Sequence, residues 1–313
     1  MSYLEKLLEG VEVQWKTLGD DTFFEIANSG RKPVKASERS PGKVPYYGAN
    51  NIQDYVEGYT HNGEYILIAE DGTQSLENYS IQWATGKFWA NNHVHVIRGT
   101  DLLNNRFVFH YLKTVNFIPF LSGGGRAKLT KGKLVEIQIP IPPLSVQKEI
   151  VRILDTFTEL TAELTAELSA RKQQYEYYRE ELLSFEEGEV EWKTLGEVTQ
   201  IKRGRRLVKS QLEEMGNYAV FQNSMTPLGY YHESNVKSNT TFIISAGSAG
   251  EIGYSNVDFW AADDVYFFLT PEHISSKFIY YFLLTKQHFI SGQVRRASIP
   301  RLSKAEFEKL KIP

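Results

Sequence analysis

The sequence contains no cysteine among its 313 residues and only 3 methionines. The absence of cysteine excludes a disulfide scaffold, a cysteine-based zinc site and a thiol nucleophile, and it is compatible with a reducing compartment. No apolar run approaches the roughly 18 residues that a membrane-spanning helix needs. The first ten residues lack the basic stretch and apolar core of a secretion signal. We therefore expect a soluble, cytoplasmic protein with no membrane partner.

Several catalytic motifs are also missing. The sequence has neither a P-loop nor the Gly-x-Ser-x-Gly motif of serine hydrolases. Gly247, Gly250 and Gly253 do not have the spacing of a dinucleotide-binding loop. The Pro142-Pro143 pair is followed by Leu144, whereas an adenine methyltransferase needs an aromatic residue after its prolines. These absences predict a chain that is not an enzyme and has no cofactor of its own.

Two short patterns resemble those found in metal sites and in nucleases. His93 and His95 would share one face of a strand, but the sequence places no evident carboxylate beside them, so we interpret them as ordinary strand residues. Glu191 and Lys193 have a nuclease-like spacing, but the matching segment around Lys16 carries glutamine in place of the acid. We therefore assign both patterns to the framework and predict no metal site.

The sequence repeats itself at an interval of about 175 residues. Residues 12–19 match residues 189–196 at seven of eight positions. Three further pairs of matching segments follow in the same order: 88–90 with 259–261, 107–112 with 278–283, and 139–140 with 312–313. This order predicts a duplicated domain with small insertions. Residues 20–60 and 197–240 barely agree, which suggests two related tasks on different targets.

The repeat has the pattern of a mixed fold. Apolar runs predict strands at 65–69, 93–97, 242–246 and 265–269, and the matching segments 107–112 and 278–283 resemble helices. Glycine-containing segments at 72–75 and 247–250 predict loops. The predicted fold class is α+β, with two similar mixed α/β domains joined by a long amphipathic helix of coiled-coil type. The predicted limits are 1–143 for the first domain with a short N-terminal helix, 144–187 for the connecting helix, and 188–313 for the second domain.

The connecting helix is predicted from Ser145, a plausible N-cap, to Glu187, just before Gly188. Its 43 residues contain no glycine or proline and would extend for about 64 Å. An apolar stripe, continued by Phe185, follows one side and suggests a partner helix. The predicted partner-helix face comprises Ile150, Leu154, Phe157, Leu160, Leu164, Leu168, Tyr175, Tyr178 and Leu182.

A tetrad repeat lies inside this helix. Thr-Ala-Glu-Leu occurs at 161–164 and again at 165–168, and Glu167 and Arg171 have the spacing of a favourable ion pair. Such a helix is either a solvated spacer with one packed face or a ruler between the domains. Adding one tetrad would lengthen it by about 6 Å while keeping the apolar row nearly in place.

By itself, the formal net charge of −3 argues against a nucleic-acid partner. The charge is, however, unevenly distributed. Residues 144–191 carry 5 basic and 12 acidic residues, residues 1–143 carry 15 of each, and residues 192–313 carry 15 basic and 11 acidic residues. The acidity therefore belongs to the helix, while the domains are neutral or basic.

Basic residues cluster at 126–133 and 202–209, which both contain glycine, and at 295–301, which contains Ser298 and Pro300. Such clusters are either solvated charge runs or phosphate-binding loops; arginine can also read guanine, and asparagine and glutamine can read adenine. In the first domain the candidate DNA-binding residues are Lys43, Asn50, Asn51, Thr73, Gln74, Asn91, Asn92, Arg126, Lys128 and Lys131. In the second they are Lys202, Arg203, Arg205, Arg206, Gln222, Asn223, Ser248, Arg295, Arg296, Ser298 and Arg301.

Together these segments resemble the specificity subunit of type I restriction–modification systems. The resemblance rests on the paired Trp-Lys-Thr-Leu-Gly openings, the Ile-Pro-Ile-Pro-Pro-Leu segment at 139–144, residues 147–155 and the tetrads. The tetrads look like those of the subfamily in which tetrad number sets the spacer of the DNA target. The family's second conserved helix would follow Pro313, and its absence here suggests a possible homodimer.

The resemblance implies that each domain reads one half of a bipartite, asymmetric site in double-stranded DNA. It also implies that the helices dock modification subunits, which bring S-adenosylmethionine, and that restriction subunits bring ATP and magnesium. Two alternatives are a truncated or regulatory scaffold protein that acts as a dimer and, less well supported, a lone nuclease. The sequence does not give the bases that are read.

Overall fold

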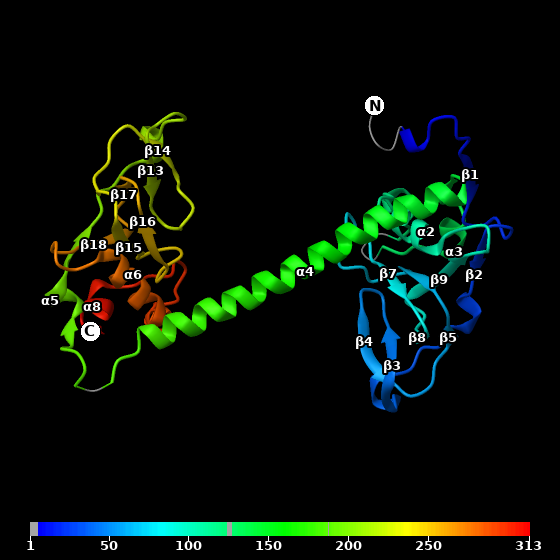
Figure 1. The fold of residues 1–313 in the computed structure, drawn as a ribbon, viewed down its shortest axis with the longest axis horizontal. Helices are drawn as coiled ribbons and strands as arrows, with labels where there is room; N and C mark the ends of the chain where they lie inside the picture. Colours follow the sequence, from blue (N-terminus) through cyan, green and yellow to red (C-terminus); the bar gives the residue numbers. More distant parts are fainter. Residues whose placement is uncertain (1–5, 124–126, 187) are drawn as a thin grey trace. The chain divides into compact units, whose positions relative to one another are not determined.

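The computed structural model describes residues 6–123, 127–186 and 188–313 (Figure 1). The chain divides into two compact units, unit 1 at 1–165 and unit 2 at 166–313. The division falls within a long helix, so each unit includes one half of it, whereas the sequence treats the helix as a separate segment. Within the described residues, no helix is long and apolar enough to cross a membrane.

Unit 1 contains two four-stranded sheets. The first is antiparallel, in the order β2 (Phe24–Ile26), β9 (Val94–Gly99), β6 (Tyr65–Ala69) and β7 (Ile81–Ala84). The second has the order β4 (Ile52–Val56), β3 (Pro41–Tyr47), β8 (Lys87–Ala90) and β5 (His61–Asn62), with β3 and β8 parallel. Its helical segments are η1 (Asn28–Gly30), η2 (Ala36–Glu38), α2 (Asn105–Leu112), η3 (Ile118–Phe120) and α3 (Lys131–Leu134).

Unit 2 repeats this arrangement. Its four-stranded antiparallel sheet has the order β12 (Gln200–Arg203), β18 (Val265–Leu269), β15 (Thr240–Ile244) and β16 (Ile252–Ser255). A second sheet has the order β14 (Gly229–Tyr231), β13 (Tyr218–Phe221) and β17 (Trp260–Ala261), with β13 and β17 parallel. Its helical segments are α5 (Leu195–Val198), η4 (Lys209–Gln211), α6 (Ser276–Thr285), α7 (Gln287–Gly292) and α8 (Lys304–Glu308). The predicted α+β fold with two similar domains and a long helix is thus confirmed.

The segments that match at the two ends of the repeat pair with each other in space. In unit 1, β1 (Gln14–Thr17) runs antiparallel to β10 (Gln138–Ile141). In unit 2, β11 (Lys193–Thr194) runs antiparallel to β19 (Lys311–Ile312). These two-stranded sheets join the start and end of each unit, which accounts for the similarity of the two ends.

The core of each unit lies between its four-stranded antiparallel sheet and one helix. In unit 1, Ile66 and Ile97 are fully buried with Val108 of α2. In unit 2, Ile243 is fully buried with Phe282 of α6. Each helix begins at a polar N-cap: Asn104 accepts hydrogen bonds from the first turn of α2, and Ser275 accepts one from the first turn of α6. Apolar burial against a capped helix stabilises both units in the same way.

The long helix α4 covers Leu144–Leu182, 39 residues or about 58 Å. The start of the predicted segment 144–187 is confirmed, whereas the N-cap at Ser145 and the continuation of the helix beyond Leu182 are wrong. Because the Pro143 carbonyl accepts the amides of Val146 and Gln147, the helix begins at Leu144, and Ser145 lies in the first turn. At the other end the helix stops at Leu182, because Leu183 turns to pack against the core of unit 2. Phe185 therefore lies outside the helix, and Glu187 lies outside the described residues.

The first turns of α4 are anchored to unit 1 by polar contacts. The Gln147 side chain, 1% exposed, accepts the Asn104 amide at 2.8 Å and donates to the Pro142 carbonyl at 2.7 Å. Asp155 accepts from Arg106 Nε at 2.9 Å and from His110 Nε2 at 2.7 Å. These contacts determine the direction in which α4 leaves unit 1.

The tetrad region of α4 is exposed along its length. The Thr161 and Thr165 hydroxyls donate to the carbonyls four residues earlier, each at 2.7 Å. The predicted ion pair forms, with Arg171 Nε 3.6 Å from Glu167 Oε1. Ile150 packs against the core of unit 1, whereas the rest of the proposed partner-helix face is solvent-exposed, at 39% for Leu154 and 72% for Leu182. The exposed residues are Leu154, Phe157, Leu160, Leu164, Leu168, Tyr175, Tyr178 and Leu182.

Candidate nucleic-acid interface

In each unit, strand ends and loops gather at one edge of the four-stranded antiparallel sheet. In unit 1, β6 ends at Ala69 opposite the start of β9 at Val94, and β2 ends beside them. We call this region the loop edge of unit 1, and it comprises residues 27–31, 48–51, 70–75, 91–93, 122–123 and 127–130. The equivalent loop edge of unit 2 comprises residues 203–206, 222–224, 245–248, 262–264 and 295–301.

Side-chain to backbone bonds tie the unit 1 loops together. Asn50 donates to the Gly72 carbonyl at 2.8 Å and accepts the Gln74 amide at 3.0 Å. Thr73 Oγ1 donates to the Ser75 carbonyl at 3.0 Å. Asn91 is 4% exposed, and its side chain accepts the His93 amide at 2.8 Å. Asn50, Thr73 and Asn91 therefore shape the loops, and the exposed Asn51, Gln74 and Asn92 remain on the surface.

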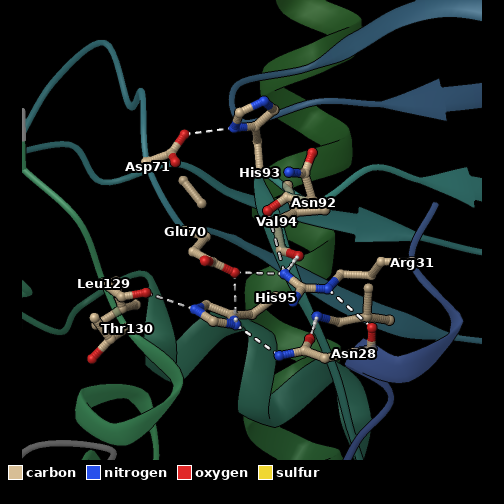
Figure 2. A network of polar contacts seen from close by, with 12 residues as sticks. Asn28, Arg31, Glu70, Asp71, Asn92, His93, Val94, His95, Leu129 and Thr130 are labelled. Atoms are coloured by element: carbon tan, nitrogen blue, oxygen red, sulfur yellow. Dashed lines mark hydrogen bonds and ion pairs between the residues drawn. The ribbon is translucent and has the colours of Figure 1, made fainter. Parts of the chain in front are cut away.

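A buried histidine holds the segment around Leu129 against the sheet (Figure 2). His95 is 1% exposed, and its Nε2 lies 2.7 Å from the Leu129 carbonyl, which can only accept. Its Nδ1 lies 2.9 Å from the Asn28 amide nitrogen and therefore accepts. These partners assign the neutral ring with the proton on Nε2. Burial lowers the pKa of His95 and so favours the same neutral form.

Glu70 connects two basic residues of the same edge, and Figure 2 shows its contact with Arg31. Its carboxylate lies 2.6 Å from Arg31 Nη1 and 3.0 Å from Lys128 Nζ. Burial alone would raise the pKa of Glu70, but the hydrogen bonds from Arg31 and Lys128 outweigh it and lower the pKa below its ordinary value. Arg31 also donates to the Val94 carbonyl at 2.8 Å. The side chains of both cations are thus held by the protein itself.

The histidine interpretation from the sequence needs a correction. His93 precedes β9 and therefore does not share a strand face with His95. Both histidines also have a carboxylate neighbour, whereas the sequence indicated none. His93 Nδ1 lies 2.6 Å from Asp71, and His95 Nδ1 lies 3.8 Å from Glu70. The acids come from the end of β6, which the sequence alone does not place beside β9. Throughout the described ranges, no three potential metal ligands gather. Lys193 and Glu191 pair with each other at 3.2 Å.

Unit 2 builds the same edge with different side chains. The Ser245 amide and hydroxyl both donate to the Asp264 carbonyl, at 2.7 and 2.9 Å, and the Leu302 amide donates to the Ser245 carbonyl at 2.9 Å. In unit 1, the Glu70 amide binds the His93 carbonyl, and the Leu129 amide binds the Glu70 carbonyl. Ser245 therefore occupies the backbone position of Glu70 and brings no carboxylate.

The arginines of unit 2 are attached to a firmly bonded backbone. Arg295 and Arg301 exchange amide-to-carbonyl bonds of 2.9 and 3.1 Å, and Arg301 bridges Ala246. The amide of Gly247 donates to Pro300. Gly247 has a φ of +81°, and a Cβ there would lie 2.6 Å from the Asn223 carbonyl oxygen, so the close approach of these loops requires glycine.

A second basic segment is attached to the Phe-Trp-Ala strand. Trp260 Nε1 donates to the Arg205 carbonyl and the Arg205 amide donates to Ala261, both at 2.9 Å. In unit 1, Trp89 Nε1 donates to the Lys32 carbonyl at 2.7 Å, and the Lys32 amide donates to the Ala90 carbonyl at 3.0 Å. The basic segment 31–39 of unit 1 is therefore the counterpart of 202–209, and the sequence interpretation missed it.

A signal for that segment was present in the sequence. Gly30-Arg31-Lys32-Pro33-Val34-Lys35 resembles Gly204-Arg205-Arg206-Leu207-Val208-Lys209. The structural alignment differs from this match by one residue, because Lys32 and Arg205 make the equivalent bonds. In unit 1 the turn η1 follows β2 and shifts the basic segment by one residue relative to its counterpart in unit 2.

Within each unit, the structure brings together most of the predicted DNA-binding residues of that unit. Those at the loop edges are Asn50, Asn51, Thr73, Gln74, Asn91, Asn92, Lys128, Arg203, Arg205, Arg206, Gln222, Asn223, Ser248, Arg295, Arg296, Ser298 and Arg301. Lys131 lies beside the edge in α3, and Lys202 lies within β12. Lys43 lies near the start of β3, whose other end reaches the edge. Arg126 lies outside the described residues.

Comparison with known proteins agrees with the family resemblance found in the sequence. A family model described as the type I restriction modification DNA specificity domain matches residues 11–171 and 187–313. A putative type I restriction enzyme specificity subunit of Haemophilus influenzae is 59% identical over 229 residues, which are 71% of this chain and 59% of that protein. The EcoR124I/EcoR124II specificity subunit of Escherichia coli is 34% identical over 286 residues, 82% of this chain and 68% of that protein.

The alignments thus span about three fifths to two thirds of these relatives' lengths. Among solved structures, the S subunit of a type I restriction-modification system from M. genitalium has a TM-score of 0.76 at 20% identity. That match covers 97% of this chain and 85% of the other. At this identity the match describes the fold.

Proposed function

Because the chain belongs to the type I restriction–modification DNA specificity family, we propose that it is the DNA-recognition subunit of a type I complex. It acts without catalysis of its own, in the cytoplasm, where the target DNA lies. The observation that carries this proposal is the pair of loop edges: two units share the backbone bonds of one site and differ in its side chains. That difference is expected of two domains that recognise different DNA sequences.

Each loop edge reads one half of a bipartite, asymmetric site in double-stranded DNA. Lysine and arginine side chains neutralise phosphates and fix the register of the protein on the duplex. Exposed amides such as Asn51 and Gln74, and arginines such as Arg296, contact base edges in the grooves. Because the loops are bonded to sheet ends, these side chains project from a backbone that needs little ordering on binding.

Helix α4 sets the spacer between the two half-sites and docks the modification subunits. Its exposed row from Phe157 to Leu182 supports this role, because a soluble chain rarely leaves such a row uncovered. We expect S-adenosylmethionine to bind the modification subunits, and ATP and magnesium to bind the restriction subunits. The two units themselves supply only recognition.

Sequencing of modified bases in cells tests this function. The chain is expressed with its modification subunit in a host that lacks type I systems. We expect methylation at one interrupted, asymmetric motif, and no methylation when either partner is omitted. Variants that exchange the loop edge of one unit for that of a relative should change one half of the motif only. Methylation at a continuous motif, or none, would contradict the proposal.

The same exposed row of α4 also supports a second candidate, a scaffold protein that dimerises through this helix. Two copies could cover each other's apolar rows. Under this alternative, the purified chain would form a dimer and would show no sequence-selective binding to duplex DNA. Sequence-selective binding that weakens as salt increases would favour the recognition subunit instead.

A further inference from the structure

The two loop edges differ in how their cations are balanced. In unit 1, Arg31 and Lys128 share the Glu70 carboxylate, and Asp71 lies at the same edge. Arg39 of the neighbouring basic segment lies 3.3 Å from Asp54 and stacks on Tyr46, with its side chain 14% exposed. Among the described residues of this edge and segment, Arg31 and Arg39 are therefore both paired with acids of unit 1.

Unit 2 has no such arrangement. Within the described ranges, no carboxylate lies within ion-pair distance of the arginines of its loop edge, although Asp263 and Asp264 belong to the same edge. Arg203 donates to a backbone carbonyl, that of Asp263, at 2.6 Å. The exposed arginines of this edge are Arg203, Arg205, Arg206, Arg295, Arg296 and Arg301.

One matched pair of residues isolates the difference. Lys128 bridges Ser122 and Asp71 in unit 1, and Arg301 bridges Arg295 and Ala246 in unit 2. Leu129, which follows Lys128, donates its amide to the Glu70 carbonyl. Leu302, which follows Arg301, donates its amide to the Ser245 carbonyl in the same way. The backbone positions are thus equivalent. Only Lys128 meets a carboxylate, because Ser245 stands where unit 1 has Glu70.

The physical consequence concerns counterions. A cation that binds a DNA phosphate releases a counterion from the duplex, and this release makes affinity fall with salt. A cation that is already paired with a carboxylate must leave that carboxylate to bind a phosphate. Because the carboxylate offsets its charge, the net positive charge that attracts DNA is also smaller than at an unpaired cation. Free arginines on a bonded backbone are suited to bidentate phosphate contacts.

We propose that unit 2 is the electrostatic anchor of the subunit and makes most of the salt-dependent phosphate contacts, while unit 1 makes fewer of them. This inference rests on the proposed DNA-recognition function and adds a division of tasks to it. The arginines at 205, 295 and 301 carry the anchor. Glu70 limits the contribution of unit 1 by holding Lys128 and Arg31.

Matched charge-removing variants test this division. Lys128→Gln and Arg301→Gln are compared with the unaltered chain, each assembled with modification subunits and bound to the cognate duplex over a range of salt concentrations. We expect Arg301→Gln to reduce the slope of log affinity against log salt by about 0.9, the value for one phosphate contact. Arg205→Gln and Arg295→Gln should each act similarly, and Lys128→Gln should leave the slope unchanged.

A second variant tests the role of the carboxylate. Glu70→Gln keeps the side-chain length and frees Arg31 and Lys128, so it should increase the slope and strengthen binding at low salt. Thermal unfolding of each variant establishes that it is folded at the assay temperature. Equal slope changes for Lys128→Gln and Arg301→Gln, or an unchanged slope in Arg301→Gln, would overturn the division while leaving DNA recognition intact. Failure of the unaltered complex to select its cognate duplex would instead overturn the proposed function.

Discussion

The indole N–H of Trp260 donates to the backbone carbonyl of Arg205 at 2.9 Å, and Trp89 makes the same bond to Lys32 at 2.7 Å. The indole thus binds the backbone of a basic residue and leaves its charged side chain free to face outward. This relationship explains why the Phe-Trp-Ala segment recurs in both units. The tryptophan is a framework residue that positions a variable loop, and its conservation between the repeats carries no information about the DNA sequence.

Replacing Trp260 with phenylalanine should therefore loosen residues 204–206. The indole is 6% exposed and packs edge-on against Tyr231, so the loss combines one hydrogen bond with some packing. We expect the free energy of unfolding to fall by about 1–3 kcal/mol. Denaturant unfolding measures this change, and hydrogen exchange should report faster exchange of the Arg205 amide. Unchanged exchange at Arg205 would show that the tryptophan does not position this loop.

The buried His95 should make unit 1 less stable in mild acid. Its pKa is lowered by burial below the roughly 6.5 of an unfolded chain, despite Glu70 nearby and with Arg31 and Lys128 also facing it. The unfolded state therefore takes up a proton first, and stability decreases as pH falls through about 6.5. Replacement by glutamine should reduce this dependence in thermal unfolding. The exposed His273 provides the control, and its glutamine variant should keep the full dependence.

Asp155 should control the attachment of α4 to unit 1. Burial raises the pKa of Asp155, but hydrogen bonds from His110 and Arg106 outweigh it and hold the pKa below its usual value. A lowered pKa gives a contribution that is present above pH ~4 and is lost as pH falls further. We expect Asp155→Asn to destabilise unit 1 by about 1–2 kcal/mol at pH 7, since the partly exposed group is screened by solvent. Urea unfolding should show this loss, whereas the exposed Glu163→Gln should be neutral.

The repeated framework could be predicted from the sequence because its residues make the same local contacts in both units. The segments around Trp15 and Trp192 match since each opens a two-stranded sheet closed by a matching Ile-Pro segment. The strands predicted at 65–69 and 265–269 from their apolar runs also coincide with β6 and β18.

The loop edges could not be assembled from the sequence, because their contacts join residues far apart in the chain. Glu70 meets Lys128 across 58 positions, and only the antiparallel pairing of β6 with β9 brings His95 to the same place. For the same reason the sequence did not indicate that Asn50 and Asn91 are occupied by backbone bonds. The end of α4 at Leu182 was missed since tertiary packing of Leu183 overrides local helix propensity.

Removing the charge of Arg296 should weaken recognition without unfolding unit 2. Arg296 is exposed and lies between Arg295 and Arg301, whose backbones are bonded to each other. We expect Arg296→Ala to reduce affinity for the cognate duplex by about tenfold, the loss of one charged contact. Affinity in a fluorescence binding assay checks this, and Lys309→Ala, whose residue lies away from the loop edge, is the control. Unchanged affinity together with unchanged methylation would remove Arg296 from the interface.

Inserting one further Thr-Ala-Glu-Leu unit after Leu168 should lengthen the gap between the two half-sites. Four residues add about 6 Å of helix and rotate it by about 40° beyond a full turn, so the apolar row stays nearly aligned. The threonine hydroxyl of the new unit can donate to the carbonyl four residues earlier, as Thr165 does. Sequencing of modified bases should then give unchanged half-sites with a spacer longer by whole base pairs. Substitution of Thr165 by alanine, which alters the tetrad without changing its length, should leave the spacer as it was. An identical motif from the lengthened chain would mean that α4 does not set the spacing.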